Sequence, residues 1–308
     1  MLGRMADNLY WMARYVDRAE TLARLLESTH TVSLMPTAGA EQAEWRALLD
    51  VSDRDSFAER YDRPTQNAVI SHLVLNPANP SSILSCFGGC RENARATRHM
   101  LTTELWEAIN QTWLEVKDLT YARLLDIGQA EFFEWVRNRA EQIQGVAAGT
   151  MRRDDGTFFL RLGSMIERAD GTARTLRLRR LAPQAEVVDY YRWGAMLRSF
   201  SAFKAYREIH RGGIEPRKVA DLLIFRHDVP RSLHFCMDGV TRVLDRLRPA
   251  AACARLAGRL HADLHYGSLD ELDDAALDAL LDDVILRNNA LGTQIQKDFM
   301  MIRQGLAG

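Results

Sequence analysis

The sequence predicts an all-α fold, a helical bundle made of two tandem pseudo-symmetric repeats. Apolar residues recur at alternating steps of three and four over long stretches, which is the period of helices packed lengthwise. No run alternates apolar and polar residues between turns at hairpin spacing, so strands are not expected. Similar residue types also return after a fixed shift of about 150 positions, which is typical of an internal duplication.

That shift aligns two separate stretches without a gap. Residues 16–20 (Val-Asp-Arg-Ala-Glu) lie over residues 166–170 (Ile-Glu-Arg-Ala-Asp), with the same charge sign at each position. Further along, the shift aligns Pro80, Ser82, Cys86 and Gly89 with Pro230, Ser232, Cys236 and Gly239. We therefore expect a first helical repeat over residues 1–150 and a second over 151–308. Because the seam between them is short and carries no low-complexity linker, they should pack as one compact body.

Each repeat is expected to open with a long core helix. The apolar stripe comprises Met5, Leu9, Met12, Val16, Ala19, Ala23 and Leu26 in the first repeat, and Phe159, Leu162, Ile166, Ala169, Ala173 and Leu176 in the second. Further helices are predicted over 41–60, 64–76, 80–101, 103–126 and 129–148, and then over 186–211, 216–225, 231–247, 250–265 and 270–304. In the turn before residue 80, Asn79 is the expected N-cap of a helix with Pro80 in its first turn.

The overall composition argues against several classes of function. The 308 residues include 40 Lys and Arg against 41 Asp and Glu, so no net field draws the chain to nucleic acid or to an anionic membrane. Acidic and arginine residues interrupt the first apolar stretch, which predicts neither a secretory signal nor a membrane span, and we expect a cytoplasmic protein. The four cysteines form no CxxC pair and no glycine-rich phosphate loop is present, so no cofactor is expected.

The charged residues beside the core stripe are the most informative feature. Arg18 lies seven residues from both Trp11 and Leu25, so its face of the helix is flanked by apolar side chains. A partly buried guanidinium needs a carboxylate and several acceptors, and Glu20, only two residues away, points in another direction. We predict that the two opening helices pack together, with Arg18 reaching Glu167 or Asp170 and Arg168 reaching Asp17 or Glu20.

Two interpretations of this motif stay open. In the first, it is a buried ion network that fixes helix register. In the second, it lines a cleft between the repeats and binds an acidic or phosphorylated ligand, because arginine grips two oxygens at once. The candidate ligand-binding residues are Arg14, Asp17, Arg18, Arg91, Glu92, Arg95, Arg168 and Asp170. Glu20 and Glu167 are candidate acid or base groups if burial raises their pKa.

The motif also resembles the opening of the bacterial alpha-E family, an all-helical group named for its glutamate and arginine motif. Residues 8–20 carry the resemblance, residues 167–170 (Glu-Arg-Ala-Asp) match the motif more literally, and residues 91–95, 104–106 and 230–236 are similar to further family segments. Asp17 is a departure, since the family usually has Glu there.

The resemblance implies a genomic setting. Members of the family are typically encoded beside, or fused to, a circularly permuted ATP-grasp ligase, often with a transglutaminase-like protein. This setting implies a cytoplasmic pathway that forms or remodels amide or peptide bonds. The helical protein would bind an acidic small molecule or peptide there, or would be a non-catalytic subunit that docks onto the ligase. Whether it is an enzyme stays open.

Three smaller groups have two interpretations each. Arg91, Arg95 and Arg98 form a basic ridge that the second repeat lacks, which indicates either a working site or a solvated helix face. Cys86 and Cys90 lie one turn apart, and buried packing is favoured over a nucleophile. His261 and His265 are also four residues apart, but no third ligand can be identified, so no metal site is predicted.

Overall fold

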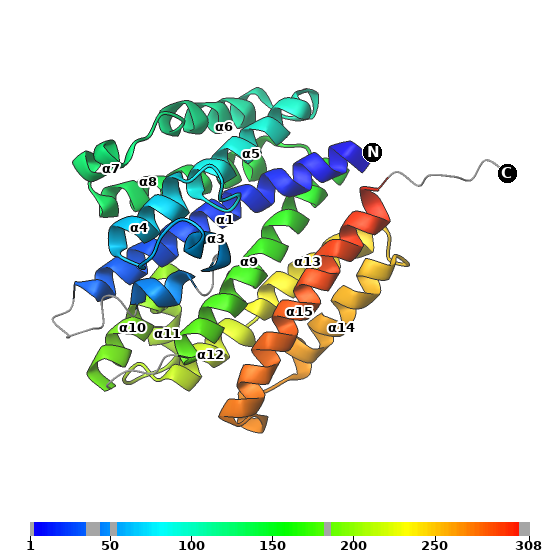
Figure 1. Cartoon of the computed structure of the whole chain (residues 1–308). Coiled ribbons are helices and arrows are strands. Elements are labelled where there is room, and N and C mark those ends of the chain that lie inside the picture. The colour runs from blue at the N-terminus through cyan, green and yellow to red at the C-terminus, as the bar shows by residue number, and fades with distance from the viewer. Residues whose placement is uncertain (1–2, 35–43, 50–53, 182–185, 302–308) are drawn as a thin grey trace.

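Two long central helices, α1 and α9, organise the computed structural model of the chain. The structure describes residues 3–34, 44–49, 54–181 and 186–301. Helix α1 spans Gly3–Ser33 and α9 spans Asp155–Leu181. The two helices cross at the centre of the molecule, with the helices of the first half gathered around α1 and most of those of the second half around α9 (Figure 1). The described residues form helices and no strand, as the sequence predicts.

The helices around α1 come from the first half of the chain. They are α3 (Arg54–Ala58), α4 (Gln66–Ile70), which continues as a π-helical turn (Ser71–Leu75), α5 (Ile83–Ala96), α6 (Thr103–Val116), α7 (Tyr121–Ile127) and α8 (Gln129–Thr150). Residues 44–49 are also helical, and Trp45 within them is fully buried.

The second half supplies the remaining helices. They are α10 (Glu186–Ser199), α11 (Phe203–Ile209), α12 (Pro216–Ile224), α13 (Leu233–Leu247), α14 (Ala252–Tyr266) and α15 (Asp274–Phe299). Short 3-10 turns lie at Arg98–Met100 and Leu269–Glu271. Helices α13 and α15 pack on α9, and α14 covers them on the outer side (Figure 1). Within the described residues, no helix combines the length and apolarity needed to cross a bilayer.

The crossing of α1 and α9 is unusually close at one glycine. A Cβ atom at Gly163 would lie 2.1 Å from the backbone oxygen of Tyr10, so only glycine fits there. On either side of this contact the predicted apolar stripes are buried, with Leu9, Val16 and Ile166 no more than 2% exposed. The contact therefore fixes how the charged residues of one helix meet those of the other.

Several predicted helix boundaries are wrong for local reasons. Asn79 is not an N-cap, because its side-chain oxygen accepts from Ser81 N at 2.9 Å inside a turn, and Ser82 caps α5 instead. The predicted helix over 103–126 is two helices, since Thr120 caps a new helix after α6 has ended. The predicted helix over 186–211 breaks at Ser201, whose φ of 56° is incompatible with a continuing helix. Part of the predicted helix over 41–60 lies outside the described residues.

Equivalent positions in the two halves have similar local structure. Ser82 caps α5 by accepting from Ser85 N, and Ser232, 150 positions later, caps α13 by accepting from Phe235 N. Cys86 and Cys236, in the first turns of these helices, are both fully buried. These features agree with the expected duplication, which stays a prediction, as do its limits at 1–150 and 151–308.

Candidate functional site

The ion pairs predicted between the two opening helices are present. Arg18 donates from Nε to Glu167 Oε1 at 2.6 Å and from Nη2 to Oε2 at 3.1 Å. Arg14 donates from Nε to the same Oε2 at 2.7 Å. The side chain of Glu167 is only 7% exposed, so two arginines of α1 neutralise one buried carboxylate of α9. The expectation that Arg18 finds its carboxylate across the two halves is confirmed.

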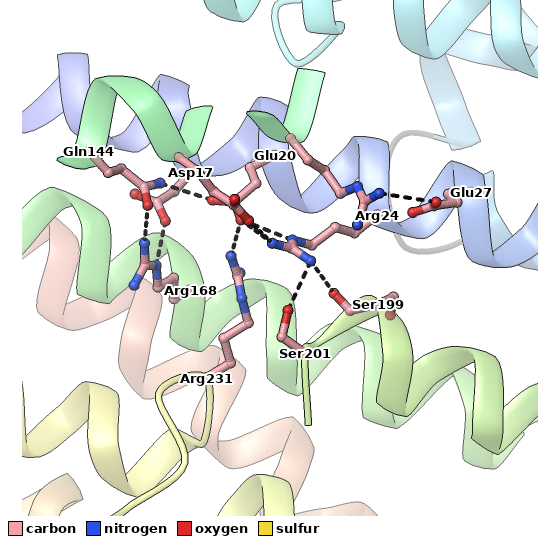
Figure 2. Close-up of polar contacts among 11 residues, drawn as sticks. Asp17, Glu20, Arg24, Glu27, Gln144, Arg168, Ser199, Ser201 and Arg231 are labelled. Atoms are coloured by element: carbon pink, nitrogen blue, oxygen red, sulfur yellow. Dashed lines mark hydrogen bonds and ion pairs between the residues drawn. The ribbon is translucent and has the colours of Figure 1, made fainter. Parts of the chain in front are cut away.

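A second pair runs in the opposite direction. Arg168 of α9 donates from Nε to Asp17 Oδ1 at 2.5 Å and from Nη2 to Gln144 Oε1 at 2.7 Å. Gln144 in turn donates from Nε2 to Glu20 Oε2 at 2.9 Å, so this α8 residue connects Glu20 to the Arg168 that holds Asp17 (Figure 2). The predicted contact from Arg168 to Asp17 is therefore confirmed, and Gln144 is a member that the sequence did not indicate.

Glu20 is the centre of the rest of the network. Its Oε1 accepts from Arg24 Nε at 2.9 Å and also from Arg231, which reaches it from the loop before α13 (Figure 2). Arg24 also donates from Nη1 to the backbone oxygen of Ser199 at 3.1 Å. The sequence identified residues 230–232 as a family-like segment without assigning Arg231 a partner, because only the tertiary structure brings it to Glu20.

Burial and the arginine contacts act in opposite directions on the pKa values of these acidic residues. Burial alone would raise the pKa of Glu167, but Arg18 and Arg14 hold it below its ordinary value. The pKa of Glu20 is likewise lowered, since Arg231, Arg24 and Arg168 outweigh its burial. Burial does raise the pKa of Asp17, and Arg168 offsets that rise only in part. A role as acid or base would require a raised pKa, and neither Glu20 nor Glu167 has one.

A cavity of about 420 Å³ lies beside this network, between α1, α8 and α9. Its apolar wall includes Met12, Val16, Leu105, Ile143, Ala147, Met151, Phe158 and Leu160, and its polar wall includes Asp17, Gln144, Arg153, Thr157, Arg161, Ser164, Arg168 and Arg246. The volume is within the range of small-molecule sites. The site thus combines an apolar body with a charged inner wall.

The cavity contains more arginines than it contains acids. Arg153, Arg161 and Arg246 are exposed residues of the lining, so they lie where the cavity opens to solvent. None of the three forms an ion pair with a residue that the structure describes, whereas Arg168 is held by Asp17. An excess of positive charge without acidic partners is suited to binding an anion.

Asp17 is a buried carboxylate at the inner wall. Its side chain is 1% exposed and Oδ1 accepts from Arg168. A side-chain hydrogen bond from Ser164, which also lines the cavity, lowers the pKa of this carboxyl and offsets part of the rise that burial causes.

The other candidate residues lie outside the cavity lining. Arg14, Arg18, Glu20 and Glu167 belong to the buried network. Asp170 accepts from Arg174 one turn later at 2.7 Å.

The basic ridge, with Arg91 and Arg95 on α5 and Arg98 in the 3-10 turn that follows, is a solvated face. There, Glu92 pairs with Arg91 at 2.6 Å and with Arg95 at 2.9 Å, and it is itself 51% exposed. Of the predicted ligand-binding set, the structure therefore brings only Asp17 and Arg168 to the cavity.

The first-half cysteines do not form a reactive site. Cys86 and Cys90 are both fully buried, and burial raises the pKa of Cys86 to about 12. A thiol with so high a pKa holds almost no thiolate at neutral pH, which agrees with the packing role that the sequence favoured.

One arginine of the cavity, Arg161, has a signal in the sequence. Arg161, Ser164 and Arg168 follow one another at steps of three and four, so they share one face of α9. Arg153 and Arg246 have no such signal, because one lies in the connection between α8 and α9 and the other on α13.

Comparisons with known proteins agree with this architecture. Residues 1–300 match the profile of Alpha-E, described as a predicted alpha-helical domain with a conserved ER motif. Uncharacterized proteins of Mycobacterium bovis and Mycobacterium tuberculosis are each 24% identical over 307 residues, which covers 90% of this chain and 34% of each relative. The chain thus spans about a third of the length of these relatives. No solved structure matches it.

Proposed function

The chain belongs to the Alpha-E family, and we propose that it binds an acidic small molecule or peptide in the cavity between α1, α8 and α9. One observation carries this proposal. Three exposed arginines without acidic partners, Arg153, Arg161 and Arg246, open onto a cavity of about 420 Å³. An ordinary solvated arginine face has no apolar cavity behind it, and an ordinary packing defect is not surrounded by cations.

The walls indicate how such a ligand would lie. Its carboxylate or phosphate would pair with the arginines at the opening, and its apolar part would pack against residues such as Val16 and Ile143. An amino acid derivative or a short acidic peptide has both features.

The proposal is one of binding rather than of catalysis. Glu20 and Glu167 stay ionised at neutral pH because their arginine partners lower their pKa, so neither is a proton donor. Asp17 has a raised pKa and faces the cavity, but Arg168 engages its other oxygen. In this role Arg168 and Asp17 hold the inner wall rigid, and the arginines at the opening recognise the ligand.

We place this binding unit beside a circularly permuted ATP-grasp ligase, with a transglutaminase-like protein as a further partner. The family resemblance supports this setting. Because the match covers 34% of each mycobacterial relative, the helical unit is one part of a longer chain there. A ligase that forms amide bonds needs an acidic substrate, which is the class of ligand that the cavity fits.

One observation favours the second candidate, a non-catalytic subunit. The side chains of Asp17, Glu20 and Glu167 are at most 7% exposed, so most of the ion network is closed to a ligand. In that case the network would only fix the α1 and α9 crossing, and another surface would contact the ligase. Only the first candidate function requires the exposed arginines of the cavity for binding a ligand.

Isothermal titration of the full chain tests the proposal. The probes are glutamate, a glutamyl dipeptide and inorganic phosphate, and the test variant is Arg161→Gln. Losing one charged hydrogen-bonding group should weaken binding of the glutamyl dipeptide by about 10- to 100-fold, since such bonds contribute roughly 1.5–3 kcal/mol. Arg259→Gln is the matched control, because Arg259 is exposed on α14 and lies outside the cavity lining.

Two outcomes would contradict the proposal. One is that none of the three probes binds the wild-type chain. The other is that Arg161→Gln and Arg259→Gln bind the dipeptide equally well. If the Arg161 variant still co-purifies with the ligase in either case, the subunit interpretation takes its place.

A further inference from the structure

Three histidines that are distant in sequence come together on the outer side of the second half. His261 and His265 lie one turn apart on one face of α14, and His234 lies in the first turn of α13. A ring nitrogen from each residue lies within 4.8 Å of a ring nitrogen from the other two. His234 is the third ligand that the sequence did not reveal, because it is 27 positions before His261.

The distance between two of these nitrogens fits a shared metal ion. His265 Nδ1 lies 3.3 Å from His234 Nε2. Two nitrogens bound at about 2.05 Å in tetrahedral geometry are roughly 3.3 Å apart, so these rings already stand at the required separation. His261 must move by about 1–1.5 Å to complete the set, given the upper limit of 4.8 Å. Its side chain is 25% exposed, so it has room to rotate.

The surroundings of His234 prepare its outer nitrogen for a cation. Its Nδ1 lies 2.8 Å from the backbone oxygen of Phe225. A carbonyl oxygen can only accept, so Nδ1 donates its proton and Nε2 keeps a lone pair directed at the other two rings. A backbone carbonyl that fixes the tautomer of a histidine in this way is the usual outer partner of a metal-binding imidazole.

An acidic residue lies next to the second ligand. Asp238 follows His234 by one turn of α13, and its Oδ1 lies 3.9 Å from Nε2 of His261. Arg242 already holds this carboxylate, donating from Nε to Oδ1 at 3.0 Å. Asp238 is therefore suited to orienting His261 as a positioning residue, and a solvent molecule would take the fourth position beside the exposed ring of His265.

We propose that His234, His261 and His265 form a binding site for a divalent transition metal ion, with zinc as the ion best suited to three neutral imidazoles. Helices α13 and α14 supply all three ligands, and none of the three lines the cavity between α1, α8 and α9. The site is therefore independent of the proposed ligand-binding function. A hydrogen bond from His265 to His234 would also explain the 3.3 Å distance, but it would not explain why His261 lies close to both rings.

Metal titration of the untagged full chain, treated with a chelator and dialysed, tests this site. We expect one Zn²⁺ per chain by calorimetry, and Co²⁺ in its place should give the intense visible absorption of a four-coordinate ion. His261→Gln and His265→Gln should each weaken Zn²⁺ binding at least tenfold and abolish the Co²⁺ absorption. Both side chains are partly exposed, so the variants should keep the fold, which circular dichroism checks.

His99→Gln is the matched control. His99 is exposed in a 3-10 turn of the first half and lies far in sequence from the three ligands. Its variant should bind Zn²⁺ as the wild-type chain does. The proposal is overturned if the wild-type chain takes up no stoichiometric Zn²⁺, or if His261→Gln and His265→Gln bind it with unchanged affinity. The second result would assign the metal to another part of the surface and leave only the hydrogen bond between His265 and His234.

Discussion

Replacing Glu167 with glutamine tests whether the crossing of α1 and α9 depends on charge. Glu167 accepts three hydrogen bonds from Arg14 and Arg18 at 2.6–3.1 Å while only 7% exposed. Glutamine has the same shape but no charge, so Glu167→Gln leaves two guanidinium groups without an ionised partner. The change therefore removes the electrostatic contribution with little effect on packing.

The expected loss follows from the burial of the partners. Removing one member of a buried ion pair costs about 3–5 kcal/mol. Arg14 and Arg18 are 15% and 24% exposed, so water can solvate part of the freed charge, and the glutamine oxygen still accepts one hydrogen bond. We therefore expect the lower end, a fall of about 3 kcal/mol in the free energy of unfolding, measured by urea titration with the denaturant slope unchanged.

Glu92→Gln is a closely matched control. Glu92 also pairs with two arginines, Arg91 at 2.6 Å and Arg95 at 2.9 Å, but it is 51% exposed on α5. Exposed pairs contribute about 0–1 kcal/mol, so this variant should unfold at nearly the wild-type urea concentration. Equal losses in the two variants would refute the reasoning, because burial would then have no influence on the strength of these pairs.

Three further results are expected. Because Arg18 and Arg14 hold the pKa of Glu167 below that of the unfolded chain, its contribution is complete above about pH 4.3 and is lost as the pH falls through the lower folded value. The stability gap between wild type and Glu167→Gln should therefore narrow in urea titrations below that pH, and a constant gap would contradict this. Asp17→Asn should cost less than Glu167→Gln at pH 7, because burial raises the pKa of Asp17 and disfavours its charged form; a larger loss in the same titration would disprove the ranking. Gly163→Ala should destabilise by about 3 kcal/mol or more because its Cβ would meet a backbone oxygen, whereas Gly145→Ala on the exposed face of α8 should stabilise by about 0.5–1 kcal/mol; calorimetric melting distinguishes the two, and equal melting temperatures would rule out the close crossing.

The cross-half ion pairs were predictable because burial restricts the choices. Arg18 has apolar neighbours on its own helix face and cannot reach Glu20, so its partner had to come from another helix. The repeat then indicated where that helix was. For each arginine, the sequence indicated two candidate carboxylates without deciding between them. The choice of Glu167 depends on the position at which Gly163 touches the backbone of Tyr10, which no local pattern reveals.

The cavity and the helix breaks were less accessible to sequence reasoning. Periodicity indicates that Val16 and Ile143 face inward, but not that the space between their helices remains partly empty. Likewise, the stretch around Ser201 keeps a helical composition, and only its φ of 56° shows that the chain turns there. Arg231 reaches Glu20 across 211 positions, a separation over which residue spacing carries no information.

Because both halves of the chain line the cavity, neither half can form it alone. Its wall takes Asp17 and Gln144 from before residue 150 and Arg161 and Arg168 from after it. A polypeptide cut between Thr150 and Met151 would yield two fragments. Each fragment would keep charged residues without their ion-pair partners, and neither would have the complete cavity. If ligand binding returned when the two fragments were mixed, it would show that they had reassociated.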